Sequence, residues 1–150
     1  MDSKTILIVE DDKDLMLAMS VRMVAHGFTI LSAEDAASAI QFCAMKKPDL
    51  ILLDLGLPDS NGFIVMDVVR QLKSAATVPI IVVSARPADV YREAALLAGA
   101  KAYFQKPFDN DALMSAIHQE IGDNSPPPGF KEFKIHCRYQ PADIATTIGR

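Results

Sequence analysis

Short apolar runs alternate with longer amphipathic segments from the N-terminus to Gly122. The runs are rich in Val, Ile and Leu, a composition typical of buried β-strands. The longer segments place apolar residues at three- and four-residue spacings, the pattern of a helix that buries one face. We therefore expect five strands, at residues 5–9, 28–33, 50–54, 78–85 and 101–106. We expect a helix after each of them, at residues 14–27, 34–47, 63–75, 88–100 and 110–122.

This alternation indicates the fold class. Strands that are apolar at nearly every position are buried on both faces, which is typical of a parallel sheet covered by helices on each side. Right-handed crossovers between successive strands then give an open, doubly wound α/β sheet. Sites in such sheets lie outside the carboxyl ends of the strands, so the polar residues there are the first candidates for function.

The composition is that of a globular domain with its own core. Of the 150 residues, 50% are hydrophobic and 23% are charged, and the formal net charge of −4 disfavours nucleic-acid binding by the chain as a whole. Cys43 and Cys137 form no CxxC pair, which fits a reducing cytosol. We expect no secretory signal in "MDSKTILIVEDD" and no membrane-spanning segment, and hence a cytoplasmic protein without a membrane partner.

The chain changes character after Gly122, so we expect the domain to occupy residues 1–122. Residues 123–130 read "DNSPPPGF", the composition of a Pro-rich linker. Residues 131–150 are too few to bury a core, and we interpret them as a tail or the truncated start of an output region. The segment "PADIATTIGR" resembles the first half of a helix-turn-helix, but a short extension is the simpler interpretation. DNA would be a partner only if an output domain followed residue 150.

One aspartate interrupts the most apolar part of the chain. Asp54 follows Leu50 to Leu53 and precedes Leu55 in "LILLDL". A carboxylate at the end of a buried strand loses its water, which is costly unless another group compensates. The strand could simply reach the surface here, or the carboxylate could be held there to bind a cation or accept a group.

Further acids follow the first expected strand. Glu10, Asp11 and Asp12 stand there, and they would converge with Asp54 if the first strand lay beside the third. Several carboxylates in one crevice repel each other, and a divalent cation removes that conflict. Oxygen ligands suit Mg²⁺. An acidic triplet after a strand is also common at an ordinary helix N-terminus.

The fourth and fifth strands end in Ser84 and Lys106. A lysine supplies a point charge for an anion, and a serine supplies a hydroxyl donor. Together with carboxylates and a metal they form a set suited to a phosphoryl group, with Asp54 as the nucleophile that becomes an aspartyl phosphate. Ser84 alone would be interpreted as a helix cap, and Lys106 alone as an exposed lysine. The order and spacing of the whole set favour the functional interpretation.

These residues resemble the receiver domain of two-component response regulators. The resemblance runs from about Thr5 to Ile121 and rests on "ILIVEDD", "ILLDLGLPDSNG", "VVSA" and "AGAKAYFQKPF". It implies a (βα)5 flavodoxin-like sandwich with a five-stranded parallel sheet of order 2-1-3-4-5. It also implies a phosphorylation-operated signalling switch that takes its phosphoryl group from a sensor histidine kinase or a histidine phosphotransfer protein.

The resemblance assigns roles around the acceptor. Asp54 is the expected phosphoacceptor and also a ligand of Mg²⁺. Asp11 is the expected direct ligand, Glu10 helps through water, and the carbonyl of Gly56 completes the set. Asp12 extends the acidic cluster, although the acidic pair of the family aligns best with Glu10 and Asp11.

The remaining roles concern the response to phosphorylation. Ser84 is the expected switch hydroxyl, and Lys106 pairs with another phosphoryl oxygen after a cis bond to Pro107. Tyr103 is the expected switch aromatic, whose ring swings inward behind Ser84, although a strand residue packed on a helix would look the same in sequence. The face made by residues 88–122 then changes. A homodimer through this face stays open, because "RPADVYREAALLAG" lacks the charge pattern of a winged-helix transcription factor's dimer face.

Two neighbours of the site are expected to tune the lifetime of the phosphoryl group. Gly56 has no side chain to obstruct or steer an attacking water, and Arg86, two residues after Ser84, is long and basic. The same Gly56 argues against a haloacid-dehalogenase phosphatase, which needs a second aspartate there. A docking module without phosphorylation would lack one of the site residues, and a flavodoxin would replace "EDD" with Ser, Thr and Gly. We therefore interpret the chain as a response-regulator receiver domain.

Overall fold

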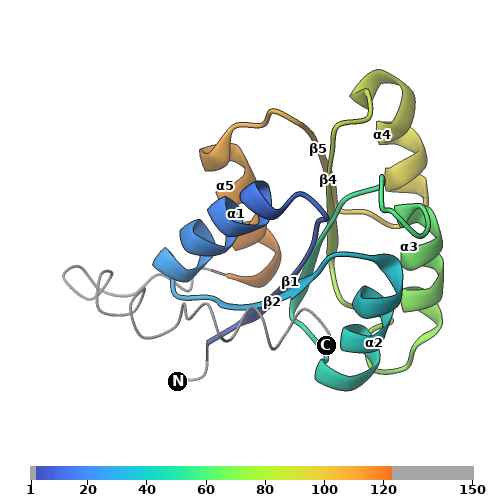
Figure 1. The fold of residues 1–150 in the computed structure, drawn as a ribbon, viewed down its shortest axis with the longest axis horizontal. Helices are drawn as coiled ribbons and strands as arrows, with labels where there is room; N and C mark the ends of the chain where they lie inside the picture. The colour runs from blue at the N-terminus through green and yellow to red at the C-terminus, as the bar shows by residue number, and fades with distance from the viewer. Residues whose placement is uncertain (1–2, 123–150) are drawn as a thin grey trace.

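The computed structural model describes residues 3–122, in which strands and helices alternate as the sequence pattern predicts (Figure 1). The strands are β1 (Thr5–Val9), β2 (Thr29–Ala33), β3 (Leu50–Leu53), β4 (Ile80–Ser84) and β5 (Ala102–Gln105). The helices are α1 (Lys13–Ala25), α2 (Ala36–Lys46), α3 (Gly62–Gln71), α4 (Ala88–Leu97) and α5 (Asn110–Ile121). The expected linker at 123–130 and tail at 131–150 lie outside the described residues.

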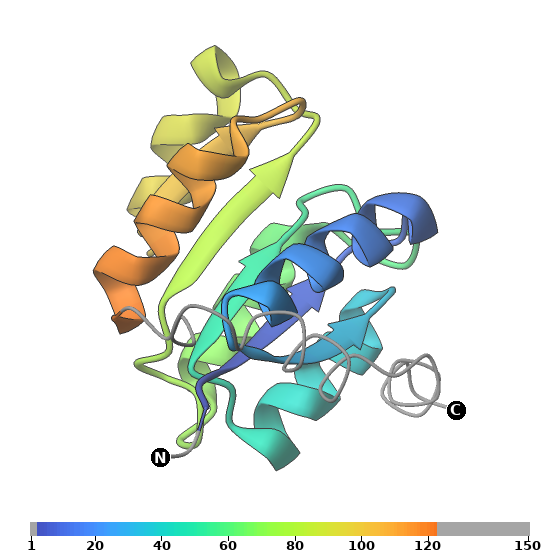
Figure 2. The same cartoon turned by 90° about the vertical axis from the view of Figure 1, so that its left-hand side faces the viewer.

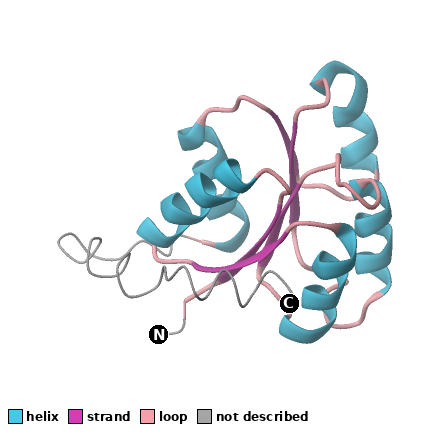
Figure 3. Cartoon of the chain, in the orientation of Figure 1, coloured by secondary structure: helices cyan, strands magenta, loops and turns pink. Residues whose placement is uncertain are grey.

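The five strands form one parallel sheet in the order β2-β1-β3-β4-β5. Helices α1 and α5 cover one face, and α2, α3 and α4 cover the other (Figure 3). The view onto the first face has α1 crossing in front of the β1 side of the sheet and α5 in front of the β4–β5 side (Figure 2). The expected doubly wound sheet with helices on both faces is confirmed, and so is its strand order.

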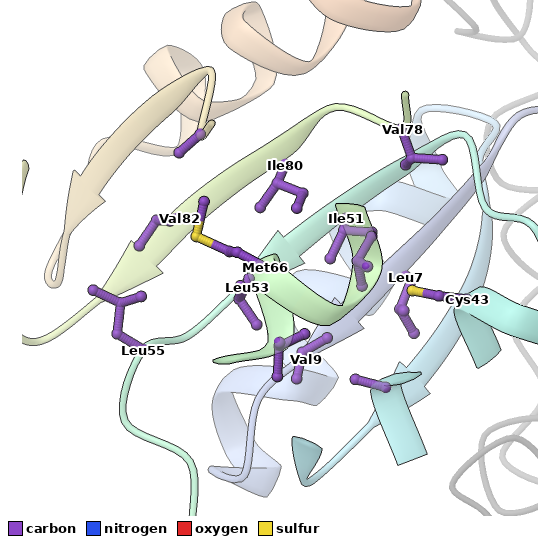
Figure 4. Packing of buried hydrophobic residues seen from close by; sticks show 14 of the residues in the cluster. Leu7, Val9, Cys43, Ile51, Leu53, Leu55, Met66, Val78, Ile80 and Val82 are labelled. Carbon is purple, nitrogen blue, oxygen red and sulfur yellow. The ribbon is translucent and has the colours of Figure 1, made fainter. Parts of the chain in front are cut away.

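The sheet has a core on each face because successive strand residues point to opposite sides. Leu7 and Val9 of β1 pack toward α2, α3 and α4 with Leu53, Met66 and others (Figure 4). Ile6 and Ile8 of the same strand pack toward α1 and α5. Burial on both faces is the physical reason why β3 and most of β1 are apolar at consecutive positions rather than at every second one.

Several element ends differ from expectation. The largest difference is in α3, which we expected to run from 63 to 75 but which ends at Gln71, because the backbone of Leu72 is extended. The guanidinium of Arg70 donates hydrogen bonds to the carbonyls of Ala76 and Val78, at 3.2 and 2.9 Å, and so folds the following loop back onto the helix. β4 begins at Ile80 rather than at 78, since Pro79 has no N–H for the strand ladder.

Helix α2 begins at Ala36 rather than at residue 34. Asp35 is its N-cap, and its side chain accepts a hydrogen bond from the N–H of Ser38 at 2.8 Å. Glu34 and Asp35 therefore precede the helix rather than standing in its first turn. Among residues 3–122, each helix is too short or too polar to cross a membrane.

Candidate functional site

The polar residues of the site meet at one edge of the sheet because the strands that carry them are parallel neighbours. Val9 and Leu53 are register partners, so Glu10 and Asp54 follow them at the same level. The N–H of Asp54 donates to the carbonyl of Val9 at 3.1 Å, and the N–H of Glu10 donates to that of Ala33 at 2.9 Å. The first and third strands therefore do lie side by side, as convergence of the acids requires.

Three carboxylates form the centre of this edge. Glu10 and Asp54 are buried, with 3% and 7% of their surface exposed, whereas Asp11 is exposed. One oxygen from each of the three lies within 4.8 Å of the others. Three hard oxygen donors at this separation suit a small divalent cation such as Mg²⁺.

Asp12 is not part of this cluster. Its side chain is the N-cap of α1 and accepts hydrogen bonds from the N–H groups of Asp14 and Leu15, at 3.0 and 3.1 Å. Of the acidic triplet, therefore, Glu10 and Asp11 turn to the cluster, and Asp12 starts the helix. The helix N-terminus that the sequence left open for the triplet is thus found at Asp12, and the expected convergence with Asp54 is found for Glu10 and Asp11.

Lys106 bridges the two buried carboxylates. Its Nζ lies 2.6 Å from Oε1 of Glu10 and 3.0 Å from Oδ2 of Asp54. The peptide bond between Lys106 and Pro107 is cis, as the family resemblance implies. The backbone N–H of Lys106 also donates to the carbonyl of Ser84 at 2.8 Å, so the lysine is held to β4.

The charges of this cluster do not balance. Burial raises the pKa of Glu10 above its ordinary value, even though Lys106 donates a hydrogen bond to it. Burial lowers the pKa of Lys106, but its hydrogen bonds to Glu10 and Asp54 outweigh burial, and the pKa is raised overall. One ammonium thus faces two buried carboxylates, with Asp11 beside them. An additional positive charge is therefore favoured at this edge.

Ser84 and Tyr103 are coupled through the backbone of Arg86. Ser84 is buried, and its Oγ accepts a hydrogen bond from the N–H of Arg86 at 3.2 Å. The hydroxyl of Tyr103 donates to the carbonyl of Arg86 at 2.7 Å, and burial raises the pKa of Tyr103. Tyr103 is 8% exposed, so its ring is largely buried in this structure.

The side chain of Arg86 points to a different partner. Its Cζ lies 5.3 Å from the centre of the Tyr91 ring, an arrangement that allows a cation–π interaction. Arg86 is partly buried between the end of β4 and the first turns of α4. The backbone of Arg86, the expected tuning residue, is therefore held beside Ser84, whereas its charged guanidinium lies over α4.

Two glycines shape the loop after Asp54. The N–H of Gly56 donates to Oδ1 of Asp54 at 3.0 Å, and a Cβ at Gly56 would meet that oxygen only at 3.9 Å. Gly56 thus places no side chain against the carboxylate. A Cβ at Gly62, in contrast, would lie 2.8 Å from the carbonyl oxygen of Asp54 and from Cα of Leu55. This close approach, which sequence analysis missed, requires a glycine.

Asp59 is a second residue that sequence analysis missed. Its carboxylate accepts hydrogen bonds from the N–H groups of Ala36 and Ala37, at 2.8 and 3.2 Å, and so attaches the loop after β3 to the start of α2. The hydrogen bond from Ala36 lowers the pKa of Asp59. The "PDSNG" sequence indicates a turn, but a partner 23 residues away in the chain has no local signal.

A groove of about 470 Å³ opens beside the lysine, between α1 and the loop that leads into α5. Leu15 and Met19 line it from α1, and Pro107 and Phe108 line it from the loop. Lys106 also lines the groove, so the groove and the carboxylate cluster share this residue.

Residues 6–118 match the family model of the response regulator receiver domain. The KDP operon transcriptional regulatory protein KdpE of Escherichia coli K12 is 36% identical over 120 residues, which are 80% of this chain and 52% of that protein. The chain spans about half the length of the curated relatives it matches.

Solved structures give the same likeness. A two-component response regulator from Clostridium difficile superposes with a TM-score of 0.74 at 26% identity, covering 79% of this chain and 96% of that one. The receiver domain of the sensor histidine kinase PA1611 from Pseudomonas aeruginosa PAO1 has a TM-score of 0.69 at 28% identity, covering 81% and 99%. That structure holds a magnesium ion coordinated in its active-site cleft.

Proposed function

The chain belongs to the family of response regulator receiver domains, and on this premise we propose that it is a signalling switch operated by phosphorylation of Asp54. The observation that carries the proposal is the pairing of Lys106 with both Glu10 and Asp54 at the carboxyl edge of the sheet. A buried carboxylate beside a fixed cation and an acidic cluster is equipped to accept a phosphoryl group.

In the proposed reaction an oxygen of the Asp54 carboxylate attacks phosphorus. The bond between phosphorus and the donor atom breaks, and the donor keeps that electron pair. The donor atom is a histidine nitrogen of a sensor histidine kinase or phosphotransfer protein, or the acetate oxygen of acetyl phosphate. Positioning and charge neutralisation supply most of the rate, because the protein has little covalent chemistry to perform.

Mg²⁺ is the proposed cofactor. Asp11, Asp54 and the carbonyl of Gly56 would hold it directly, and Glu10 would contribute through water. The spacing of the three carboxylates and their excess negative charge support this set. When bound, the ion supplies the positive charge that neutralises the phosphoryl oxygens.

The side chains of this chain would hold the phosphoryl group once it is formed. Lys106 already reaches Oδ2 of Asp54, so its ammonium can pair with one phosphoryl oxygen. Ser84 is the last residue of β4, the strand beside β3, and can donate its hydroxyl to another oxygen. A shift of the Ser84 hydroxyl toward the phosphoryl group would displace the N–H of Arg86, which is bonded to it. The carbonyl of Arg86 would pass this displacement to Tyr103, and so to the face of α4, β5 and α5.

The switch would end by hydrolysis. A water oxygen attacks phosphorus, the bond to Asp54 breaks with its electron pair returning to the carboxylate, and the water proton passes to solvent. The chain thus assists its own phosphorylation and dephosphorylation without being a conventional enzyme. Gly56 and Arg86 are the residues that we propose tune this rate.

Partners and location follow from the proposal. The groove between α1 and the α5 loop is open beside Lys106, which supports it as the place where a phosphodonor protein approaches. The face of α4, β5 and α5 would act on the output or on a second copy of the chain. We propose that the domain occupies residues 1–122, the linker residues 123–130 and a tail or truncated output region residues 131–150. We also propose that the protein is cytoplasmic. DNA binding would need a domain after residue 150.

The test is phosphorylation by acetyl phosphate with and without Mg²⁺, followed by intact mass. We expect a gain of one phosphoryl group that depends on Mg²⁺ and is absent in Asp54→Asn. Asp12→Asn is the matched control, because it removes a neighbouring charge but keeps an oxygen for the α1 cap. It should gain the group like the wild type. A gain in Asp54→Asn equal to that of the wild type would contradict the proposal.

A further inference from the structure

The guanidinium of Arg86 is held by an aromatic ring rather than by an acid. It stacks over Tyr91 at 5.3 Å, and among residues 3–122 it forms no salt bridge with a carboxylate. Tyr91 belongs to α4 and is partly buried against the core on the α2, α3 and α4 face. The ring therefore offers a fixed platform on the helix.

The backbone of Arg86 is held at both ends, so only its side chain is free to take another position. Its N–H is bound to Oγ of Ser84 and its carbonyl accepts from Tyr103, at 3.2 and 2.7 Å. These two bonds keep the backbone of Arg86 beside the Ser84 hydroxyl, at the end of the strand next to β3. The direction of the guanidinium then depends on which of two partners binds it, the Tyr91 ring or an anion formed at Asp54.

A phosphoryl group at Asp54 would be a strong competitor. Guanidinium pairs with phosphate oxygens through parallel hydrogen bonds, and it does so better than any other side chain. Gly56, two residues after Asp54, has no side chain that could cover the group. Of the two residues proposed to tune the lifetime, Gly56 and Arg86, only Arg86 has a long side chain. Once released from Tyr91, it could shield phosphorus from water.

We propose that Tyr91 is a positioning residue that holds the Arg86 guanidinium over α4 and so keeps the phosphoryl group on Asp54 open to hydrolysis. This inference rests on the proposed function, because it concerns the loss of the phosphoryl group from Asp54. In the hydrolysis it controls, a water oxygen bonds to phosphorus and the Asp54 oxygen leaves with the electron pair. Tyr91 touches none of these atoms and acts only through Arg86.

The first test needs neither Mg²⁺ nor phosphorylation. Protons of the Arg86 side chain that lie over an aromatic ring resonate upfield in NMR spectra of the unphosphorylated protein. We expect this upfield shift in the wild type and in Tyr91→Phe, which keeps the ring, and its loss in Tyr91→Leu. An Arg86 side chain with unshifted signals in the wild type would overturn the inference.

The second test measures the lifetime of the phosphoryl group. Protein phosphorylated with acetyl phosphate is separated from the donor, and its phosphorylated fraction is followed by intact mass. We expect Tyr91→Leu to lengthen the lifetime about two- to five-fold, the range that a partly exposed cation–π contact allows, and Tyr91→Phe to leave it unchanged. In an Arg86→Gln background, Tyr91→Leu should have no further effect.

The outcomes separate the two proposals. An equal effect of Tyr91→Leu with and without Arg86 would mean that the ring acts through the fold, and would overturn this inference alone. A shorter or unchanged lifetime in Tyr91→Leu would do the same. Absence of any phosphorylation in the wild type would overturn the proposed function, and this inference with it.

Discussion

Asp59 lies in the loop after β3, yet its carboxylate caps a different helix. The proposed acceptor, the acidic pair, the serine and the lysine could all be singled out from sequence, because each stands at or just after the end of an apolar run that marks a strand. Asp59 and Gly62 were not, because their roles depend on neighbours that only the folded chain brings together. Residues that position a site through tertiary contacts have no periodic signal.

The capping role of Asp59 predicts a pH-dependent stability. Its pKa in the folded chain is lowered from 3.8 by the hydrogen bond from Ala36, so its contribution is present above the unfolded pKa and is lost as pH falls through the folded pKa. We expect Asp59→Ala to lower the free energy of unfolding by about 0.5–1 kcal/mol at neutral pH, the low end of the capping range because the side chain is exposed. Urea unfolding of both proteins at a series of pH values measures this difference.

Asp59→Asn is the control for charge. It keeps a carbonyl oxygen for the N–H groups of α2 but cannot ionise, so most of the stability should remain while its dependence on pH near the carboxyl pKa disappears. The ionised carboxylate would not be the cause if Asp59→Ala lowered the free energy of unfolding as much near pH 3 as at neutral pH.

At the scale of elements, the ends of helices were harder to predict than their existence. Helix α3 stops at Gln71 because Arg70 reaches ahead to Ala76 and Val78, and it also donates to the carbonyl of Gly99 at 3.2 Å. Helix α4 begins after Pro87, whose side chain cannot cap it. The hydrogen-bond acceptor for the start of this helix comes from another element. Oε1 of Gln105, at the end of β5, accepts a hydrogen bond from the N–H of Ala88 at 2.8 Å.

The contact between Gln105 and Ala88 predicts that β5 stabilises the start of α4. Gln105→Leu keeps a similar size but removes the acceptor, and we expect it to lower the free energy of unfolding by about 0.5–1 kcal/mol. Amide hydrogen exchange should become faster in the first turn of α4. Gln105→Glu retains oxygen acceptors, favoured at a helix N-terminus, and should behave like the wild type. Equal losses in the two variants would show that the cap is not the cause.

At the scale of the whole molecule, the fold was predictable because one pattern repeats five times. Runs of four consecutive apolar residues in β1 and β3 indicated burial on both faces, and parallel strands place their polar ends at one edge. Composition and periodicity did not give the order of the strands; the family resemblance did, and the structure agrees. The hydrogen bond from Tyr103 to the carbonyl of Arg86 could not be predicted, since the two residues are 17 positions apart in the chain.

The central claim is that the edge of this sheet directs a phosphoryl group to one carboxylate among several. Reduction of the phosphorylated protein with borohydride converts the modified aspartate to homoserine, which peptide mass spectrometry then locates. We predict homoserine at position 54 alone, and only after phosphorylation in the presence of Mg²⁺. Homoserine at position 11 or 12, or a modified carboxylate elsewhere in the chain with position 54 unchanged, would contradict the account.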